Sequence, residues 1–271
     1  SAVSDRVGRK PLMVASMFSA AILTILSAFA QDYAQLLAIR AALGISLGGM
    51  PAVAMAYLGE EIEGPSLGLS MGLYIAGSAF GGMSGRLIAS MLSDFLSWRW
   101  ALGVLGVAGV LAAAEFWRSL PASKNFVPTT RGWNALPHAI KQHFSDQGLP
   151  WLFCLAFVLM GCFVSLYNYI GYRLLAAPFG LRQSTVGLLA FLYLIGIFSS
   201  VWAGRLVDRL GRRGVLWIML SVMLSGILLT LFDSLPLIVI GMALATFGFF
   251  ASHSIASSWV SRRARAPQAL A

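Results

Sequence analysis

The chain contains 271 residues, of which 58% are hydrophobic and only 11% are charged, and its mean hydropathy is +0.80. So little charge excludes an ordinary water-soluble domain and predicts an integral membrane protein. The formal net charge is +9, but the basic residues are distributed among many short turns. We therefore expect no nucleic-acid partner, because nucleic-acid binding would need those residues gathered on one water-facing surface.

Eight apolar segments are long enough to cross a bilayer, which takes about 20 helical residues. The first four predicted spans cover residues 11–30, 34–58, 66–92 and 98–118. The other four cover residues 150–172, 184–204, 214–233 and 235–258. Each is expected to be helical, because an open strand in lipid would leave backbone amides and carbonyls unpaired. The predicted fold class is therefore all-α and membrane-embedded.

One long polar connector divides these spans into two groups of four. We predict an N-terminal bundle over residues 1–118, a linker over residues 119–149 and a C-terminal bundle over residues 150–271. Four apolar residues of the linker recur at helical spacing: Trp133, Leu136, Ile140 and Phe144. This pattern favours an amphipathic helix on the membrane surface, and a simple tethering coil is the alternative.

The basic residues also predict an orientation. When the connectors are assigned alternately to the two sides, 14 of the 19 Lys and Arg residues fall on one side, three fall on the other and two lie inside spans. Basic residues are retained on the cytoplasmic face of a membrane. We therefore expect a multi-pass protein of the inner (plasma) membrane whose two chain ends, as given, are both cytoplasmic.

A six-residue motif occurs twice. Residues 5–10 read Asp-Arg-Val-Gly-Arg-Lys, and residues 208–213 read Asp-Arg-Leu-Gly-Arg-Arg. Each copy leads directly into a long apolar run. Internal duplication of this kind is typical of transporters that are built from two related halves.

The longer stretch Gly204–Arg213 resembles the loop motif between the second and third helices of each half in the major facilitator superfamily. In the first copy, Ser1 stands where the motif has glycine. Residues 39–48, which include Arg40, are similar to the fourth-helix pattern of that family. Residues 77–86 resemble its fifth-helix antiporter motif, with Gly82 in place of a proline and Arg86 in place of the last glycine.

Two further stretches, Phe163–Arg173 and Phe249–Trp259, are similar to a bacterial inner-membrane branch of the superfamily. The resemblance implies that the eight spans correspond to helices three to ten of a twelve-helix fold. It also implies a secondary transporter of small molecules that works by alternating access, exchanges protons for its substrate in the direction of efflux, and is a monomer in the bilayer. No enzymatic activity, cofactor or metal is expected.

The resemblance assigns the repeated motif the role of a conformational latch. The expected latch residues are Asp5, Arg6, Gly8, Arg9, Gly204, Asp208, Arg209, Gly211 and Arg212. Ionisable or polar residues inside spans are expensive and usually face a partner or a wet cavity. The expected residues of a substrate or proton pathway are Arg40, Arg86, Asn168, Tyr169 and His253.

Small residues in two of the spans predict close helix packing. Gly44 and Gly48 are four residues apart, as are Gly77, Gly81 and Gly85. Such spacing, with Gly49 beside the first pair, lets two helix backbones approach each other, which close packing and a rocking hinge would both need.

Two other interpretations stay open at this stage. One is a truncated membrane protein that does not transport and only pairs with another polypeptide. The other is an intramembrane serine protease, in which Ser84 and His253 would form a nucleophile–base pair. The duplicated basic loops have no role in that chemistry.

Overall fold

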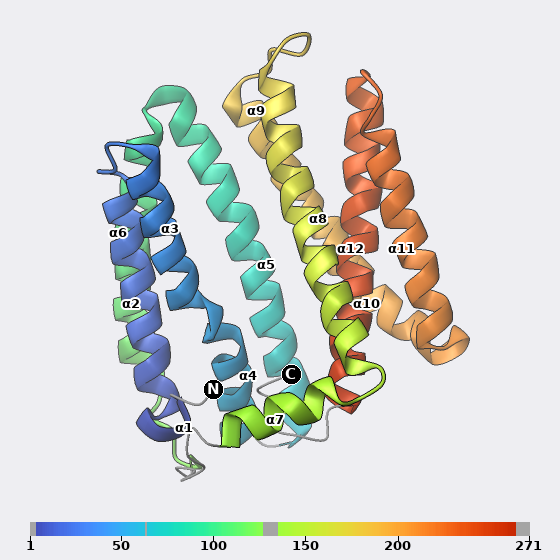
Figure 1. Ribbon diagram of the computed structural model, residues 1–271. Coiled ribbons are helices and arrows are strands. Elements are labelled where there is room, and N and C mark those ends of the chain that lie inside the picture. The colour runs from blue at the N-terminus through green and yellow to red at the C-terminus, as the bar shows by residue number, and fades with distance from the viewer. Residues whose placement is uncertain (1–3, 63, 127–134, 264–271) are drawn as a thin grey trace. The chain divides into compact units, whose positions relative to one another are not determined.

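The computed structural model describes residues 4–62, 64–126 and 135–263 (Figure 1), and within these ranges its regular elements are helices, without a strand. The N-terminal elements are α1 Ser4–Val7, α2 Arg9–Ser27, α3 Tyr33–Gly48, α4 Met50–Glu61, α5 Gly64–Phe95 and α6 Trp98–Ser119. The others are α7 Ala135–Phe144, α8 Leu149–Leu175, α9 Gln183–Gly187, the 3-10 helix η1 Leu188–Phe191, α10 Leu192–Leu210, α11 Arg212–Leu229 and α12 Leu235–Arg263. The predicted all-α class is confirmed.

The chain forms two compact units. The first comprises residues 1–78 and 88–140, and the second comprises residues 79–87 and 141–269. The middle of α5 therefore belongs with the second unit, whereas both of its ends belong with the first. The two units are described separately below.

Seven helical segments of the described chain are long and apolar enough to cross a membrane. The predicted span at residues 66–92 coincides with α5, which has 32 residues but is not among the seven. Its sequence contains seven glycines and six serines, and these small or polar residues lower its hydropathy below that of the other spans.

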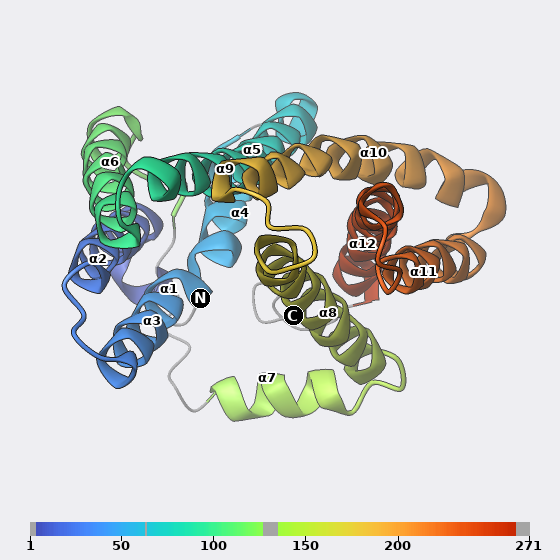
Figure 2. The same cartoon turned by 90° about the horizontal axis from the view of Figure 1, so that it is seen from above.

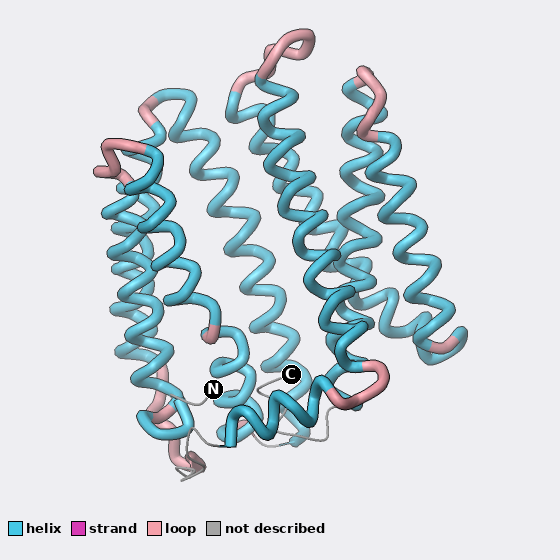
Figure 3. Tube along the Cα trace, in the orientation of Figure 1, coloured by secondary structure: helices cyan, strands magenta, loops and turns pink. Residues whose placement is uncertain are grey.

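Two predicted spans are interrupted. The segment predicted at 34–58 consists of α3 and α4, which meet at Gly49 (Figure 3). Pro51 lies in the first turn of α4, and a proline cannot continue a helix because it lacks the N–H and clashes with the preceding turn. The segment predicted at 184–204 begins as α9, tightens into η1 and continues as α10.

In the first unit, α2 packs closely against α6. A Cβ atom added to Gly106 would lie 2.4 Å from Ile25 Cγ1, and one added to Gly109 would lie 3.1 Å from Ala21 Cβ. Near the motif end of α2, Met13 is buried together with Val53 and Tyr57 of α4. Helix α2 thus packs against α6 through glycines and against α4 through buried apolar side chains.

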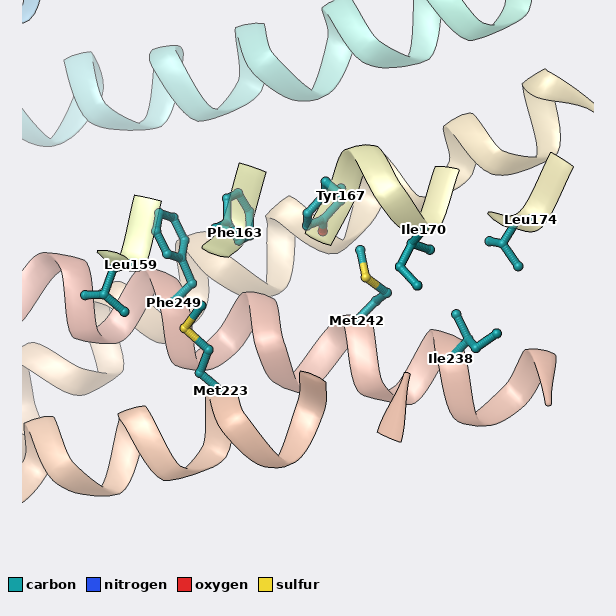
Figure 4. Packing of buried hydrophobic residues seen from close by; sticks show 9 residues of the cluster. All are labelled: Leu159, Phe163, Tyr167, Ile170, Leu174, Met223, Ile238, Met242 and Phe249. Atoms are coloured by element: carbon teal, nitrogen blue, oxygen red, sulfur yellow. The ribbon is translucent and has the colours of Figure 1, made fainter. Parts of the chain in front are cut away.

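The main core of the second unit lies between α8, α11 and α12 (Figure 4). Its buried residues are Leu159, Phe163, Tyr167, Ile170, Leu174, Met223, Ile238, Met242 and Phe249. The rings of Phe163 and Phe249 are stacked, with centroids 3.9 Å apart and planes inclined by 9°. The α8 residues recur every three or four positions, so one stripe of this helix faces the core.

Helices α11 and α12 lie side by side (Figure 2) and meet through glycines. A Cβ atom at Gly226 would lie 2.4 Å from the backbone nitrogen of Ala245 and 2.5 Å from the carbonyl oxygen of Gly241. At Gly248 it would lie 2.6 Å from the carbonyl oxygen of Met219. These contacts are with backbone atoms, which cannot move aside as a flexible side chain can.

The glycines expected to mediate close packing from their spacing are placed differently. At Gly44, Gly48, Gly77, Gly81 and Gly85, an added Cβ atom would meet no other atom within 4 Å in the structure. The close contacts within each described unit therefore lie at other glycines, and the role predicted for these five stays a prediction. The glycines at the described helix crossings include Gly106, Gly226 and Gly248. Which residues face them depends on tertiary packing, and spacing along one helix does not reveal it.

The linker contains a helix, as predicted, over Ala135–Phe144, and the coil alternative is wrong for this stretch. Trp133 lies outside the described residues. Ile140 and Phe144 are 49% and 63% exposed, whereas His143 is 3% exposed and lies edge-on to the Phe153 ring of α8. The helix thus presents an apolar pair outward, one turn apart.

Replacing Gly226 with alanine is expected to destabilise the protein by about 1–3 kcal/mol, because the added methyl group must push two helix backbones apart. Thermal unfolding in detergent measures the change. Gly214→Ala on the same helix is the control, since its Cβ position is open and alanine is the better helix former. Equal stability of the two variants would contradict the assigned packing.

Candidate functional site

The glycines of the two motif copies share an unusual backbone conformation. Gly8 has φ = +102° and directly precedes α2, and Gly211 has φ = +75° and directly precedes α11. Residues with a Cβ atom rarely adopt positive φ, whereas glycine does so at little cost. Each copy therefore forms a sharp turn that begins a spanning helix, and the predicted importance of both glycines has a conformational cause.

In the first copy, Arg9 joins the motif to the end of α4. Its guanidinium group pairs with the Glu60 carboxylate, with Nη2 2.7 Å from Oε1 and Nε 3.2 Å from Oε2. Arg9 Nη1 also donates a hydrogen bond to Ser4 Oγ, and the guanidinium lies over the Phe126 ring at 5.4 Å. The Arg9 and Glu60 side chains are 10% and 30% exposed, so the charges are largely removed from water.

The same network reaches the chain that follows α6. Lys10 Nζ donates to the carbonyl oxygen of Leu120, and the Tyr57 hydroxyl donates to that of Pro121 at 3.1 Å. The Asn125 backbone N–H donates to Glu61 Oε1 at 2.9 Å. The first motif is thus bound both to α4 and to the beginning of the linker.

The second copy lacks the contacts of the first among the described residues. Arg209 is exposed, and the buried Arg212 Nε has no hydrogen-bond partner within the described chain. Gly204 is exposed, with open space at its Cβ position. The side chains of Asp5, Arg6 and Asp208 lie outside the described residues, so their predicted latch contacts stay predictions.

A charge reversal explains this difference between the copies. The two helical segments that follow the motif helices both contain 29 residues, Tyr33–Glu61 and Leu235–Arg263. The first ends with the acids Glu60 and Glu61, and the second ends with Arg263. Because an arginine stands at the end of α12, Arg212 has no acidic partner there.

Arg263 instead binds the turn before α8. Its Nε lies 2.5 Å from Asp146 Oδ1, which also accepts hydrogen bonds from the backbone N–H groups of Gly148 and Leu149 at 2.8 and 2.9 Å. A Cβ atom on Gly148 would lie 2.7 Å from Arg263 Cζ, so glycine leaves room for the guanidinium. This contact ties the end of α12 to the start of α8.

Stability should depend on pH through this contact. The hydrogen bond from Arg263, followed by those from Gly148 and Leu149, lowers the pKa of the Asp146 carboxyl from 3.8 to about 2. A lowered pKa in the folded state stabilises the fold above pH 3.8, and this contribution is lost as the pH falls toward 2. It should be small, because both side chains are partly exposed and screened by water.

Thermal unfolding of the protein and of Asp146→Asn at a series of pH values tests this expectation. The variant should unfold at a lower temperature at neutral pH, and the difference should vanish between pH 3.8 and about 2. A difference that stays constant through that range would show that the Asp146 charge does not contribute.

Arg86 and His253 flank one group of aromatic rings in the second unit. This aromatic cluster consists of Phe163, Tyr167, Tyr193, Phe249 and Phe250. The Arg86 guanidinium carbon lies 5.4 Å from the centre of the Tyr167 ring, and the His253 ring lies 5.6 Å from that of Phe249. Two of the residues expected to line a pathway thus contact the same aromatic cluster, through different rings.

The other expected pathway residues lie elsewhere. Asn168 and Tyr169 are exposed on α8, next to the buried Tyr167 in the sequence. Arg40 is exposed on α3 in the first unit, with no hydrogen bond or ion pair to another described residue. No hydrogen bond joins Ser84 to His253 among the described residues, so the geometry gives no support to a serine nucleophile.

Sequence reasoning missed two residues at these sites and left a third open. Glu60, Glu61 and Glu63 form an acidic cluster in the sequence, for which solvation and pairing with the basic loops were both open; Glu60 is paired with Arg9. Asp146 precedes Gly148 and Pro150, a pattern typical of a turn that starts a helix. Tyr167 had no such signal, because its place beside Arg86 depends on how α8 faces α5.

Comparison with known proteins identifies relatives over the whole chain. The family model for the Major Facilitator Superfamily matches residues 1–271. The chain is 47% identical to the inner membrane transport protein YnfM of Escherichia coli (strain K12), over 97% of the chain and 63% of that protein. It is 42% identical to the uncharacterized MFS-type transporter YybF of Bacillus subtilis (strain 168), over 97% of the chain and 65% of that protein.

A solved structure supports the same fold. The crystal structure of a D-xylose–proton symporter superposes with a TM-score of 0.60 at 17% sequence identity, over 96% of this chain and 67% of that one. The chain spans less than two thirds of the length of the two relatives named above. Both are named as transporters and not as enzymes. On the match of the family model and these identities, the chain belongs to the Major Facilitator Superfamily.

Proposed function

We propose that this protein is a secondary transporter that moves small molecules across the bacterial inner membrane by alternating access. The observation that carries the proposal is the pair of motif turns at Gly8 and Gly211, each with a positive φ and each at the start of a spanning helix. Family membership and the YnfM relationship support the same conclusion.

The proposed direction is efflux in exchange for protons. Its support is the likeness of residues 77–86 to the fifth-helix antiporter motif. The basic side of the membrane, with both motif copies, is proposed to be cytoplasmic because of the positive-inside rule. In this orientation the latch acts on the inner gate.

The latch is proposed to stabilise one conformation through charge contacts on the cytoplasmic side. In the first half, Arg9 holds the motif turn against Glu60. Breaking such a contact in one state and forming it in another changes the balance between the two states. Asp5 and Asp208 are proposed to act in the same way, with Arg6, Arg209 and Arg212 as neighbouring charges.

Neutralising Asp208 is expected to abolish transport. The test measures the accumulation of radiolabelled aromatic solutes in inside-out vesicles that carry a proton gradient. Anionic, neutral and cationic solutes are compared. Asp208→Asn should reduce accumulation to the level of vesicles without the protein, and so should a protonophore. Glu115→Gln, at an exposed position of α6, should leave accumulation unchanged. Normal accumulation by Asp208→Asn would contradict the proposed latch.

A further inference from the structure

The spans of this chain carry positive charge in their interior and no matching negative charge. Eight of the ten acidic residues lie outside the eight predicted spans, and the other two, Glu115 and Asp233, lie within three residues of a span end. Arg40 and Arg86, by contrast, each lie six residues inside a span. A buried charge is expensive unless it is paired.

Arg86 is half-buried and has no anionic partner among the described residues. Its guanidinium group lies over the face of the Tyr167 ring. The Tyr167 hydroxyl is engaged with Thr246 Oγ1 at 2.8 Å, and Thr246 is fully buried. Arg86 therefore contacts the ring of Tyr167, whereas the hydroxyl group of Tyr167 is hydrogen-bonded to Thr246.

Residues 79–87 of α5 meet an aromatic ring beside Arg86. Gly82, one turn before Arg86 and so on the same face, would place its Cβ atom 3.9 Å from Tyr193 Cε1. At Gly81 and Gly85, which lie to the sides of that face, an added Cβ atom would meet nothing within 4 Å. Arg86 thus stands next to a tyrosine ring, with open space at the two flanking glycines.

The rings are connected to one another, but only Tyr193 and Phe250 are half-buried, whereas Phe163, Tyr167 and Phe249 belong to the buried core. Tyr193 lies edge-on to Phe163, Tyr167 and Phe250, with centroids 5.7, 5.4 and 5.6 Å away. Aromatic rings pack well against planar unsaturated groups. A guanidinium group matches the two oxygens of a carboxylate through parallel hydrogen bonds.

We propose that Arg86, together with the half-buried rings of Tyr193 and Phe250, binds a substrate that carries a carboxylate on a flat, aromatic or unsaturated body. The carboxylate supplies the negative charge that the spans lack, and these two rings contact the body. This inference rests on the proposed transport function and names its class of substrate.

Three ligands of nearly the same shape test the charge requirement. Benzoate, benzamide and benzamidine are an anion, a neutral molecule and a cation. Their binding to the purified protein in detergent is measured by the rise in unfolding temperature at increasing ligand concentration. Benzoate should stabilise the protein and the other two should not.

Arg86→Gln should weaken benzoate binding about tenfold or more, the loss expected when a charge-assisted hydrogen bond is removed. Arg86→Lys keeps the charge but not the paired geometry, so its affinity should lie between those of the wild type and Arg86→Gln. If Arg86→Gln does not fold, the weaker benzoate binding expected of Arg86→Lys tests the proposal in its place. Arg118→Gln, an exposed arginine of α6, is the matched control and should bind benzoate normally.

Several results would overturn this assignment. They are a preference for benzamide or benzamidine, binding of none of the three, and a benzoate preference that survives in Arg86→Gln. Transport is measured separately in vesicles. Binding that depends on Arg86 without any solute accumulation would contradict the transport function alone, whereas accumulation without a benzoate preference would contradict only the substrate class.

Discussion

Reversing the charge of Arg9 should unfold or inactivate the first unit, and reversing Glu60 as well should restore part of what is lost. Arg9→Glu would place two carboxylates where the structure has an ion pair with a 2.7 Å contact. Breaking a buried pair is expected to destabilise by about 3–5 kcal/mol, toward the lower end here because Glu60 is 30% exposed. The exchanged pair, Arg9→Glu with Glu60→Arg, keeps opposite charges at the same two positions.

Thermal unfolding and vesicle accumulation are measured for both single variants and for the double variant. Because Arg9 also contacts Ser4 and Phe126, the rescue should be partial in both measurements. Arg118→Glu is the control. It makes the same change from arginine to glutamate at an exposed position in the last turn of α6. If the double variant is no better than the worse single variant, the Arg9–Glu60 contact is not what holds the motif.

Replacing Arg40 with alanine should abolish transport while leaving the protein folded and inserted. Arg40 is exposed within a span and has no partner among the described residues, so its removal breaks no described contact. An arginine opposes insertion by about 2.5–3.5 kcal/mol at the centre of a spanning helix and by less nearer its end, where Arg40 lies, and alanine should therefore insert at least as well. Loss of one charge-assisted contact in the pathway corresponds to a decrease of about tenfold or more in rate.

Accumulation in vesicles is compared at equal amounts of inserted protein. Arg40→Lys should keep a fraction of the activity, because the charge remains but the forked donor geometry is lost. Arg182→Ala, at an exposed position before α9, should transport normally. Unchanged flux in Arg40→Ala would remove this residue from the proposed pathway.

Apolar length and turn chemistry were sufficient to predict most of the helices. The span expected at residues 98–118 is α6, Trp98–Ser119, and the span expected at 150–172 is α8, Leu149–Leu175. These segments have no internal proline or run of small polar residues. Gly49 and Pro51 are residues that interrupt helices, and they could have predicted the break between α3 and α4. The span was nevertheless predicted as continuous, because its apolar content is high throughout.

The candidate site was predictable where a residue's role depends on its own backbone. Gly8 and Gly211 follow from the motif because a turn of that shape needs a positive φ. The partners of Arg9, Arg86 and Arg263 were not predictable, because each is supplied by a helix distant in the sequence. Glu60 and Arg263 stand at corresponding helix ends and carry opposite charges. The two similar motifs therefore have different neighbours, and the partner of one could not be predicted from the other.

The central claim is that the two motif turns face the same side of the membrane and move relative to each other during transport. Spin labels on cysteines introduced at the exposed positions Val7 and Leu210, after replacement of Cys154 and Cys162, allow their separation to be measured by pulsed electron resonance. The proposal predicts two populations of distances in membranes, with proportions that shift when Asp208 is changed to Asn. A single distribution that the substitution leaves unchanged would contradict it.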